Sequence, residues 1–192
     1  MIIDINNVFL TGKVGWFKTY DIGNKSFTSM SIRIDTHDNL SFFIDVPLDP
    51  KKLASKSYAY LLGYLNDKNK SGIIYINGTV VNRKNKDDSV GMQIRCSLSN
   101  LLIAPDASPV NQVIVSGKVH SASDKSIVLN SRYNNPLDKT IKTRVIYAKP
   151  VAGLQADGNK ELIIHGSLAS KKIGDKEVLY INSEKAIVIW KD

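Results

Sequence analysis

The stretch VIVSGKV at residues 113–119 nearly repeats the stretch VFLTGKV at residues 8–14. The repetition continues in the same order, because LIIHGSLASKK at 162–172 matches IYINGTVVNRK at 74–84. An ordered internal repeat of this kind predicts two copies of one small domain.

The copies are separated by the segment APDASPVNQ at 104–112, which has the prolines and small polar residues of a linker. We therefore expect a first domain at residues 1–104, a linker at 105–111 and a second domain at 112–192.

Each copy alternates apolar and polar residues, which is the pattern of strands that are buried on one face. In the first copy this alternation predicts strands near residues 8–14, 30–34, 40–46, 74–83 and 90–96.

One segment of the first copy departs from the alternation. Asp49 is a candidate N-cap, Pro50 suits the first turn of a helix, and from Tyr58 onward the apolar residues recur at helical spacing. A helix is therefore expected at about residues 50–68, between the third and fourth strands. Five strands with one helix in that place is the layout of an OB-fold barrel.

The second copy lacks this helical pattern. Its corresponding interval, residues 149–159, contains a proline, two glycines and no periodic apolar face, so we expect a loop and a trimmed barrel. The sequence predicts an all-β protein, with one helix in the first domain, built from two tandem five-stranded OB-fold barrels.

The charge is the most informative part of the composition. The chain has 26 Lys and Arg against 18 Asp and Glu, which gives a net charge of +8. Thirteen basic and nine acidic residues lie on either side of Ala104, so the excess belongs to both domains. Such a charge favours a polyanionic partner, and the alternative is a merely soluble basic protein.

Other features of the composition narrow the class of protein. Cys96 is the only cysteine, so neither an intramolecular disulfide nor a Cys-based zinc cluster is expected. No apolar run reaches the roughly 18–20 residues of a membrane span, and the N-terminus has no cationic signal region. We expect a cytoplasmic protein without a membrane partner.

No group of residues has the spacing of a catalytic site. The histidines, His37, His120 and His165, lie far apart, and His37 within DTHD at 35–38 fits a turn better than a metal site. The Gly-Lys pairs lack the other residues of a phosphate-binding loop. We expect no enzyme activity, no cofactor and no metal.

Strand alternation places Phe43 on the outer face of the third strand, between Ser41 and Asp45. An exposed ring there either offers a stacking surface to a ligand or packs against a loop or a second copy. Cations fall at outer positions of other strands, and a ring among cations suits single-stranded nucleic acid. A shift of 101 residues pairs Phe43 with Arg144 in the second domain.

The end of the first strand and the loop between the fourth and fifth strands flank the predicted cleft. GWFKTY at 15–20 is the densest aromatic and basic group, divided between core packing and ligand contact, and NRKNKDDSVG at 82–91 fits either phosphate contacts or a solvated hairpin. The candidate nucleic-acid-binding residues are Phe43, Arg33, Arg83, Arg95, Lys13, Trp16, Lys18, Tyr20, Lys84, Lys86, Tyr75, Lys118, Lys142, Arg144 and Lys171.

The ordered phrases NNVFLTGKVG, SFTSMSIRID, FFIDVP and IYINGTVVNRKNKDDSVGMQIRC resemble the single-stranded-DNA-binding (SSB) proteins of bacteria and their phages. The resemblance covers residues 6–104 and, more faintly, 111–190. Cellular members usually have an acidic-tipped tail and stacking tryptophans, whereas this chain ends at IVIWKD and has Phe43 and, approximately, Asn85 at the tryptophan positions. In these respects it is more similar to a phage or mobile-element type.

We therefore expect a non-enzymatic protein that binds single-stranded DNA and coats it during replication or recombination, largely without sequence preference. The alternatives are an assembly adaptor that binds replisome proteins through its barrels, and an RNA-binding module. Replication or recombination proteins are further expected partners, reached without an acidic recruiting tail. The outward Phe9 favours a homodimer.

Overall fold

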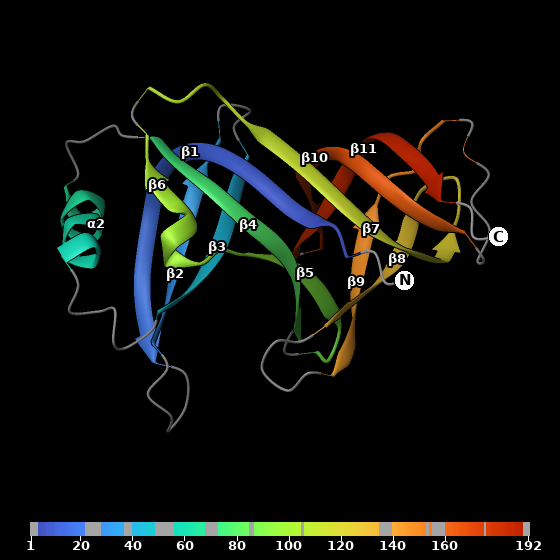
Figure 1. Ribbon diagram of the computed structural model, residues 1–192, viewed down its shortest axis with the longest axis horizontal. Coiled ribbons are helices and arrows are strands. Elements are labelled where there is room, and N and C mark those ends of the chain that lie inside the picture. The colour runs from blue at the N-terminus through green and yellow to red at the C-terminus, as the bar shows by residue number, and fades with distance from the viewer. Residues whose placement is uncertain are drawn as a thin grey trace. The chain divides into compact units, whose positions relative to one another are not determined.

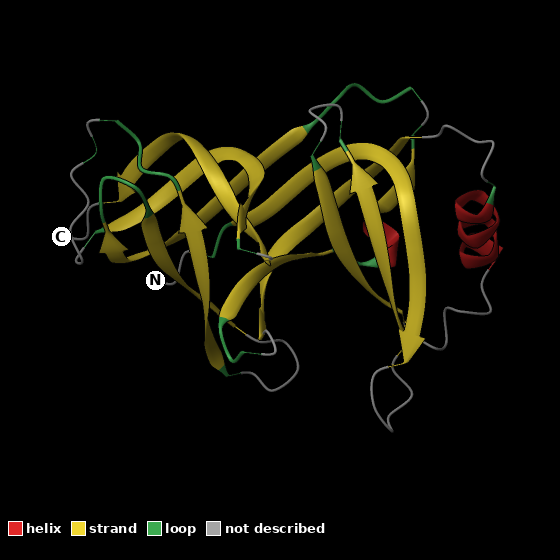
Figure 2. Ribbon diagram, turned by 180° about the vertical axis from the view of Figure 1, so that it is seen from behind, coloured by secondary structure: helices red, strands yellow, loops and turns green. Residues whose placement is uncertain are grey.

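The structure is a computed structural model that describes residues 4–21, 28–36, 40–48, 56–67, 73–84, 87–104, 106–134, 140–152, 154, 160–174 and 176–189. Within these residues the regular elements are eleven strands, one α-helix and one 3-10 turn, η1 (Leu98–Asn100), and strands dominate both views (Figures 1 and 2). No helix in this part of the chain has the length and apolarity needed to cross a membrane.

The first barrel is made of β1 (Asn6–Asp21), β2 (Thr28–Asp35), β3 (Ser41–Leu48), β4 (Ile73–Lys84) and β5 (Val90–Arg95). These strands pair in the order β1-β2-β3-β5-β4, and β4 pairs back with β1, as Figure 1 shows in blue and green. A closed ring of five strands in this order is an OB fold. A short strand that we did not predict, β6 (Leu101–Ile103), extends the sheet from β4.

The second barrel is made of β7 (Asn111–Ala122), β8 (Ile127–Asn134), β9 (Ile141–Ala148), β10 (Glu161–Ile173) and β11 (Lys176–Ile189). Its strands pair in the order β7-β8-β9-β11-β10, and β10 pairs back with β7. This is the same ring with the same order. The predicted fold, two tandem OB-fold barrels, is therefore confirmed.

The described helix, α2 (Lys56–Asn66), lies within the range predicted for it. Tyr58 and Leu61 are buried, as the helical spacing of the apolar residues predicts, whereas the proposed N-cap and first turn at Asp49 and Pro50 lie outside the described residues. In the second copy, the described residues 149–152 and 154 form no helix.

The chain divides into two compact units whose limits differ from those of the sequence repeat. One unit comprises Met1–Val8, Val80–Gln93 and Gln112–Asp192, and the other comprises Phe9–Thr79 and Ile94–Asn111. Strands β1, β4 and β5 therefore contribute residues to both units. The domains predicted from the repeat, in contrast, are segments expected to fold on their own, and their boundaries stay predictions.

Asparagine side chains join backbone segments in the unit that contains the second barrel. Asn6 donates to the Val80 carbonyl at 2.8 Å and accepts from the Val80 N–H at 2.9 Å. Asn82 does the same with Val145, at 2.7 and 2.6 Å. Each side-chain amide thus supplies the pair of hydrogen bonds that a neighbouring strand would otherwise provide.

The glycine of the repeated GKV phrase is explained by close approach of two strands. A Cβ atom at Gly12 would lie 2.7 Å from the carbonyl oxygen of Asp35, and one at Gly117 would lie 3.1 Å from that of Asn130. Strand one of each barrel crosses the next strand closely, with no room for a side chain at Gly12 and a tight contact at Gly117. The glycine of the GKV phrase therefore recurs at the position where the geometry of each barrel favours a residue without a side chain.

Candidate nucleic-acid interface

Among the strand aromatics whose side chains the structure describes, Phe43 is the most exposed, with 50% of its surface accessible. Its neighbours in sequence, Phe42 and Ile44, are buried, with only 3% and 0% of their surface exposed. The predicted alternation of these residues on β3 is therefore confirmed. Arg33 on β2 lies directly opposite Phe43 in the antiparallel register, and its side chain is 45% exposed. A ring and a guanidinium group therefore stand next to each other on the outer face.

The guanidinium of Arg33 is fixed by two polar neighbours. Its Nε lies 3.0 Å from Oδ1 of Asp35, and its Nη2 donates to the Ser41 hydroxyl at 3.2 Å. Ser41 in turn donates to the same Asp35 oxygen at 2.6 Å. These contacts hold Arg33 beside Phe43, and the carboxylate offsets part of its charge.

Arg95 on β5 is held in a similar way from the other side of β3. Asp45 and Arg95 are register partners in the parallel β3–β5 pair, and Nε of Arg95 lies 2.8 Å from Oδ2 of Asp45. Asp45 is only 5% exposed although its position in the alternation is an outer one, because the arginine covers it. The Arg95 side chain itself is 51% exposed.

The lysines predicted on strand one, Lys13 and Lys18, are both exposed. GWFKTY forms the end of strand β1, as predicted, and the backbone of β1 pairs Trp16 with Arg33. The side chains of Trp16 and Tyr20 lie outside the described residues.

The predicted cations at the end of β4, Arg83 and Lys84, are exposed, and Nζ of Lys84 lies 2.6 Å from a carboxylate oxygen of Asp88. Lys86 lies outside the described residues. Tyr75 is half-buried and pairs with Leu102 across β4 and β6.

The two barrels match in geometry, and the match fixes which residues are equivalent. Ile44 pairs with Ile94 in the parallel contact of β3 with β5, as Ala148 pairs with Ile181 in the parallel contact of β9 with β11. Gly78 of β4 lies close to the carbonyl of Arg95, and Gly166 of β10 lies close to the carbonyl of Asn182 in the same way. Equivalent pairs are Ile44 and Ala148, Gly78 and Gly166, Ile94 and Ile181, and Arg95 and Asn182.

The predicted equivalence of Phe43 and Arg144 is therefore wrong. The register shift on strand three is 104 residues and not 101, so Phe43 corresponds to Tyr147. The predicted shift is three residues too short, and an odd displacement along a strand exchanges its outer and inner faces. Arg144 lies on the inner face and is 8% exposed.

Arg144 already has partners in its buried position. Its guanidinium lies 3.0 Å from a carboxylate oxygen of Asp4 and 4.1 Å from the ring centroid of Tyr133. A role for Arg144 in binding stays a prediction, and its burial between these partners weighs against phosphate contact. The other second-barrel cations that we predicted, Lys118, Lys142 and Lys171, are exposed.

The sequence reasoning missed three residues of the second barrel that resemble the predicted set, namely Tyr147, Tyr180 and Lys149. Tyr147 on β9 takes the position of Phe43, and its hydroxyl donates to the carbonyl of Val90 at 3.3 Å. Tyr180 on β11 has the ammonium groups of Lys149 and Lys171 near its ring. A correct strand-three alignment and the alternation of LYIN at 179–182 are the signals that point to them.

The face around Phe43 combines one aromatic ring with guanidinium groups on both neighbouring strands. Such a ring stacks on any base because every base has a π-face, and the cations attract phosphates.

Comparison with known proteins agrees on the fold. No protein-family profile matches the chain, and no curated protein sequence matches it. Among solved structures it is similar to the single-stranded DNA binding protein from Thermus aquaticus, with a TM-score of 0.65 and 11% identity over 98% of this chain and 95% of that one. A deletion variant of that protein aligns with the same TM-score, 12% identity and coverages of 98% and 96%.

A mitochondrial single-stranded DNA binding protein from S. cerevisiae, Rim1, aligns over 55% of this chain and 99% of its own length, with 12% identity and a TM-score of 0.32. The likeness of fold to the Thermus aquaticus structure extends over 98% of this chain, and therefore over both barrels.

Proposed function

We propose that the protein binds single-stranded DNA without enzymatic activity and coats it during replication or recombination, largely without sequence preference. The observation on which this rests most is the half-exposed Phe43 directly opposite Arg33 on the outer face of an OB barrel. The likeness of the whole fold to a protein named for single-stranded DNA binding supports the proposal.

The chemistry of the site favours single strands over duplex. A ring stacks on a base only when the base face is accessible, and in duplex both faces are covered by neighbouring bases. The arginines and lysines supply the phosphate attraction that both forms share. Discrimination between them is therefore assigned to Phe43, and the overall affinity to the net charge of +8.

Further parts of the proposal follow from the sequence: the family resemblance, the absence of a signal region and the outward Phe9. They are an origin in a phage or mobile element, a cytoplasmic site of action, and a homodimer. The alternative of an adaptor that binds only proteins predicts no affinity for oligonucleotides.

The test is a competition titration of the full chain. A fluorescently labelled oligo-dT is bound first, and unlabelled oligo-dT, oligo-U and a DNA duplex of equal length are added as competitors at one low salt concentration. We expect oligo-dT to compete at least tenfold better than duplex. Equal competition by duplex would remove the stacking argument, stronger competition by oligo-U would make RNA the ligand, and absence of any binding would favour the adaptor.

A further inference from the structure

Tyr180 lies at the centre of a second ring-and-cation cluster, on the second barrel. It is on β11, while Lys171 is on the neighbouring strand β10 and Lys149 directly follows β9. The ammonium groups of Lys149 and Lys171 lie 5.7 and 5.8 Å from the centroid of the Tyr180 ring. The backbone holds this arrangement, because the N–H of Lys149 donates to the carbonyl of Ile181 at 2.8 Å.

The lysines of this cluster differ from the arginines beside Phe43 in their charge pairing. Arg33 and Arg95 each have a carboxylate within 3.0 Å. Among the described residues, no carboxylate lies within ion-pair distance of Lys149 or Lys171, and both side chains are exposed. Phosphates that bind here have no internal ion pair to displace.

The equivalence of the two barrels makes this difference specific to one position. Lys149 follows Ala148 as Asp45 follows Ile44, so the residue that neutralises Arg95 in the first barrel is replaced by a lysine in the second. The same face thus has a carboxylate in one barrel and a cation in the other.

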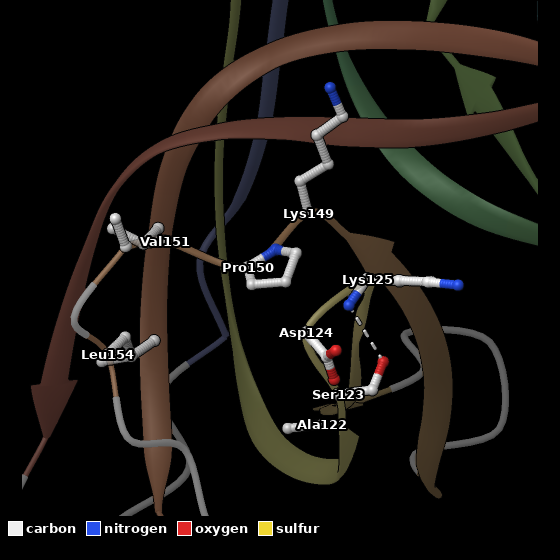
Figure 3. Close-up of a pocket in the computed structure, with 9 residues that line it drawn as sticks. Ala122, Ser123, Asp124, Lys125, Lys149, Pro150, Val151 and Leu154 are labelled. Atoms are coloured by element: carbon white, nitrogen blue, oxygen red, sulfur yellow. Dashed lines mark hydrogen bonds between the residues drawn. The ribbon is translucent and has the colours of Figure 1, made fainter.

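A hollow of about 680 Å³ adjoins the cluster and shares Lys149 with it. Its walls are Ala122–Lys125, from the turn between β7 and β8, and Lys149–Ala152 with Leu154. Figure 3 shows the Lys149 side chain pointing away from Asp124, Val151 and Leu154. Its ammonium group is the one that lies near the Tyr180 ring. A volume of this size holds a nucleotide, and the walls combine apolar side chains such as Val151 and Leu154 with polar ones such as Ser123.

We propose that Tyr180, Lys149 and Lys171 form a second nucleotide-binding site, in which a base of a single strand stacks on the Tyr180 ring and the flanking phosphates pair with the two ammonium groups. The adjoining hollow receives a neighbouring nucleotide of the same strand, with Lys125 at its rim and Asp124 as its one described carboxylate. This inference rests on the proposed binding of single-stranded DNA.

The test uses the full chain with oligo-dT, and it measures affinity at several salt concentrations. Loss of one stacking contact corresponds to about 5- to 150-fold in Kd, so Tyr180→Ala is expected to weaken binding within that range while Tyr180→Phe stays within about threefold of wild type. The double variant Lys149→Gln/Lys171→Gln should make the slope of log K against log salt shallower by about 1.4. Lys185→Gln, an exposed lysine elsewhere on β11, is the matched control and should change affinity less than about twofold.

Each outcome decides a different point. Wild-type affinity and slope in both Tyr180→Ala and the double-lysine variant would overturn this site while leaving the proposed function intact. An equal loss in Tyr180→Phe and Tyr180→Ala would mean that the hydroxyl and not the ring is used, and would also overturn it. No binding by the wild-type chain would overturn the function and the site together. Thermal melts identify unfolded variants, and the exposed lysines keep the test valid if Tyr180→Ala does not fold.

Discussion

Phe43→Ala is the substitution that separates binding from folding most clearly. Burying a whole phenylalanine side chain is worth about 1.5–3 kcal/mol, and half of that surface is still exposed in the free protein. A stacked base would bury the remainder, about 0.8–1.5 kcal/mol, and ring-ring geometry adds about 0.5–1.5 kcal/mol. We therefore expect Phe43→Ala to weaken oligo-dT binding by about 1–3 kcal/mol.

Phe42→Ala is the matched control, because it removes the same ring from the adjacent position on the opposite face. Phe42 is 3% exposed, so its truncation leaves a core cavity that costs about 3–5 kcal/mol of stability. Phe43→Ala should change the melting temperature little, and Phe43→Trp should preserve or strengthen binding. Fluorescence anisotropy with labelled oligo-dT measures affinity, and circular dichroism melts measure stability.

The reasoning would be refuted if Phe43→Ala destabilised the fold while the affinity of each folded molecule stayed unchanged. The ring would then be a structural residue. Unchanged affinity and unchanged stability would equally remove Phe43 from the interface.

Three further predictions concern the framework that positions the site. Asn82→Ala leaves the N–H and the carbonyl of Val145 without their side-chain partner, so we expect a loss of about 1–3 kcal/mol in urea unfolding with an unchanged m-value; an unchanged midpoint would show that water replaces the amide. Gly166→Ala places a Cβ far inside contact distance of the Asn182 carbonyl, and should lower stability by about 1–3 kcal/mol; a neutral result would mean that the strands separate freely. Burial raises the pKa of Cys96 from 9.0 to about 12, so the folded chain should resist thiol reagents at pH 8, and its stability should decline as the pH rises from about 9 towards 12, where only the unfolded thiol ionises; rapid labelling without denaturant would contradict this.

The barrels were predictable from the sequence because each strand is buried on one face. The alternation of FFIDV at 42–46 places Phe42, Ile44 and Val46 inside, as the structure has them. The repeat of Gly12 at Gly117 could also be recognised in the sequence, and its structural reason is that strand one approaches its neighbour closely at both positions.

The surroundings of the cations were predicted less well, because the alternation along a strand shows which side chains face outward but not which of them form ion pairs. Arg33 and Arg95 do lie on the outer face, but the alternation did not show their carboxylate partners, Asp35 two residues along the same strand and Asp45 on the neighbouring strand β3. Arg144 was assigned to the wrong face because the predicted offset between the two third strands was three residues too short. Its partner Asp4 is 140 residues away in the sequence. Contacts of such long sequence separation leave no local pattern.

The cluster around Tyr180 was missed for the same reason. Its two lysines belong to β10 and to the segment after β9, and only the folded sheet brings them to one ring. In sequence, Lys149 stands in a segment read as a loop, and Tyr180 stands in a strand with no other outward aromatic in its described part.

The affinity of the wild-type chain for oligo-dT, measured across a series of salt concentrations, tests the central claim most directly. A net charge of +8 and cations on the outer faces of both barrels predict tight binding at low salt, with log K falling against log salt by about 0.7 for each phosphate neutralised. We expect several phosphates to be engaged, hence a slope steeper than about −2. Affinity that is absent at low salt, or that does not change with salt, would contradict the account.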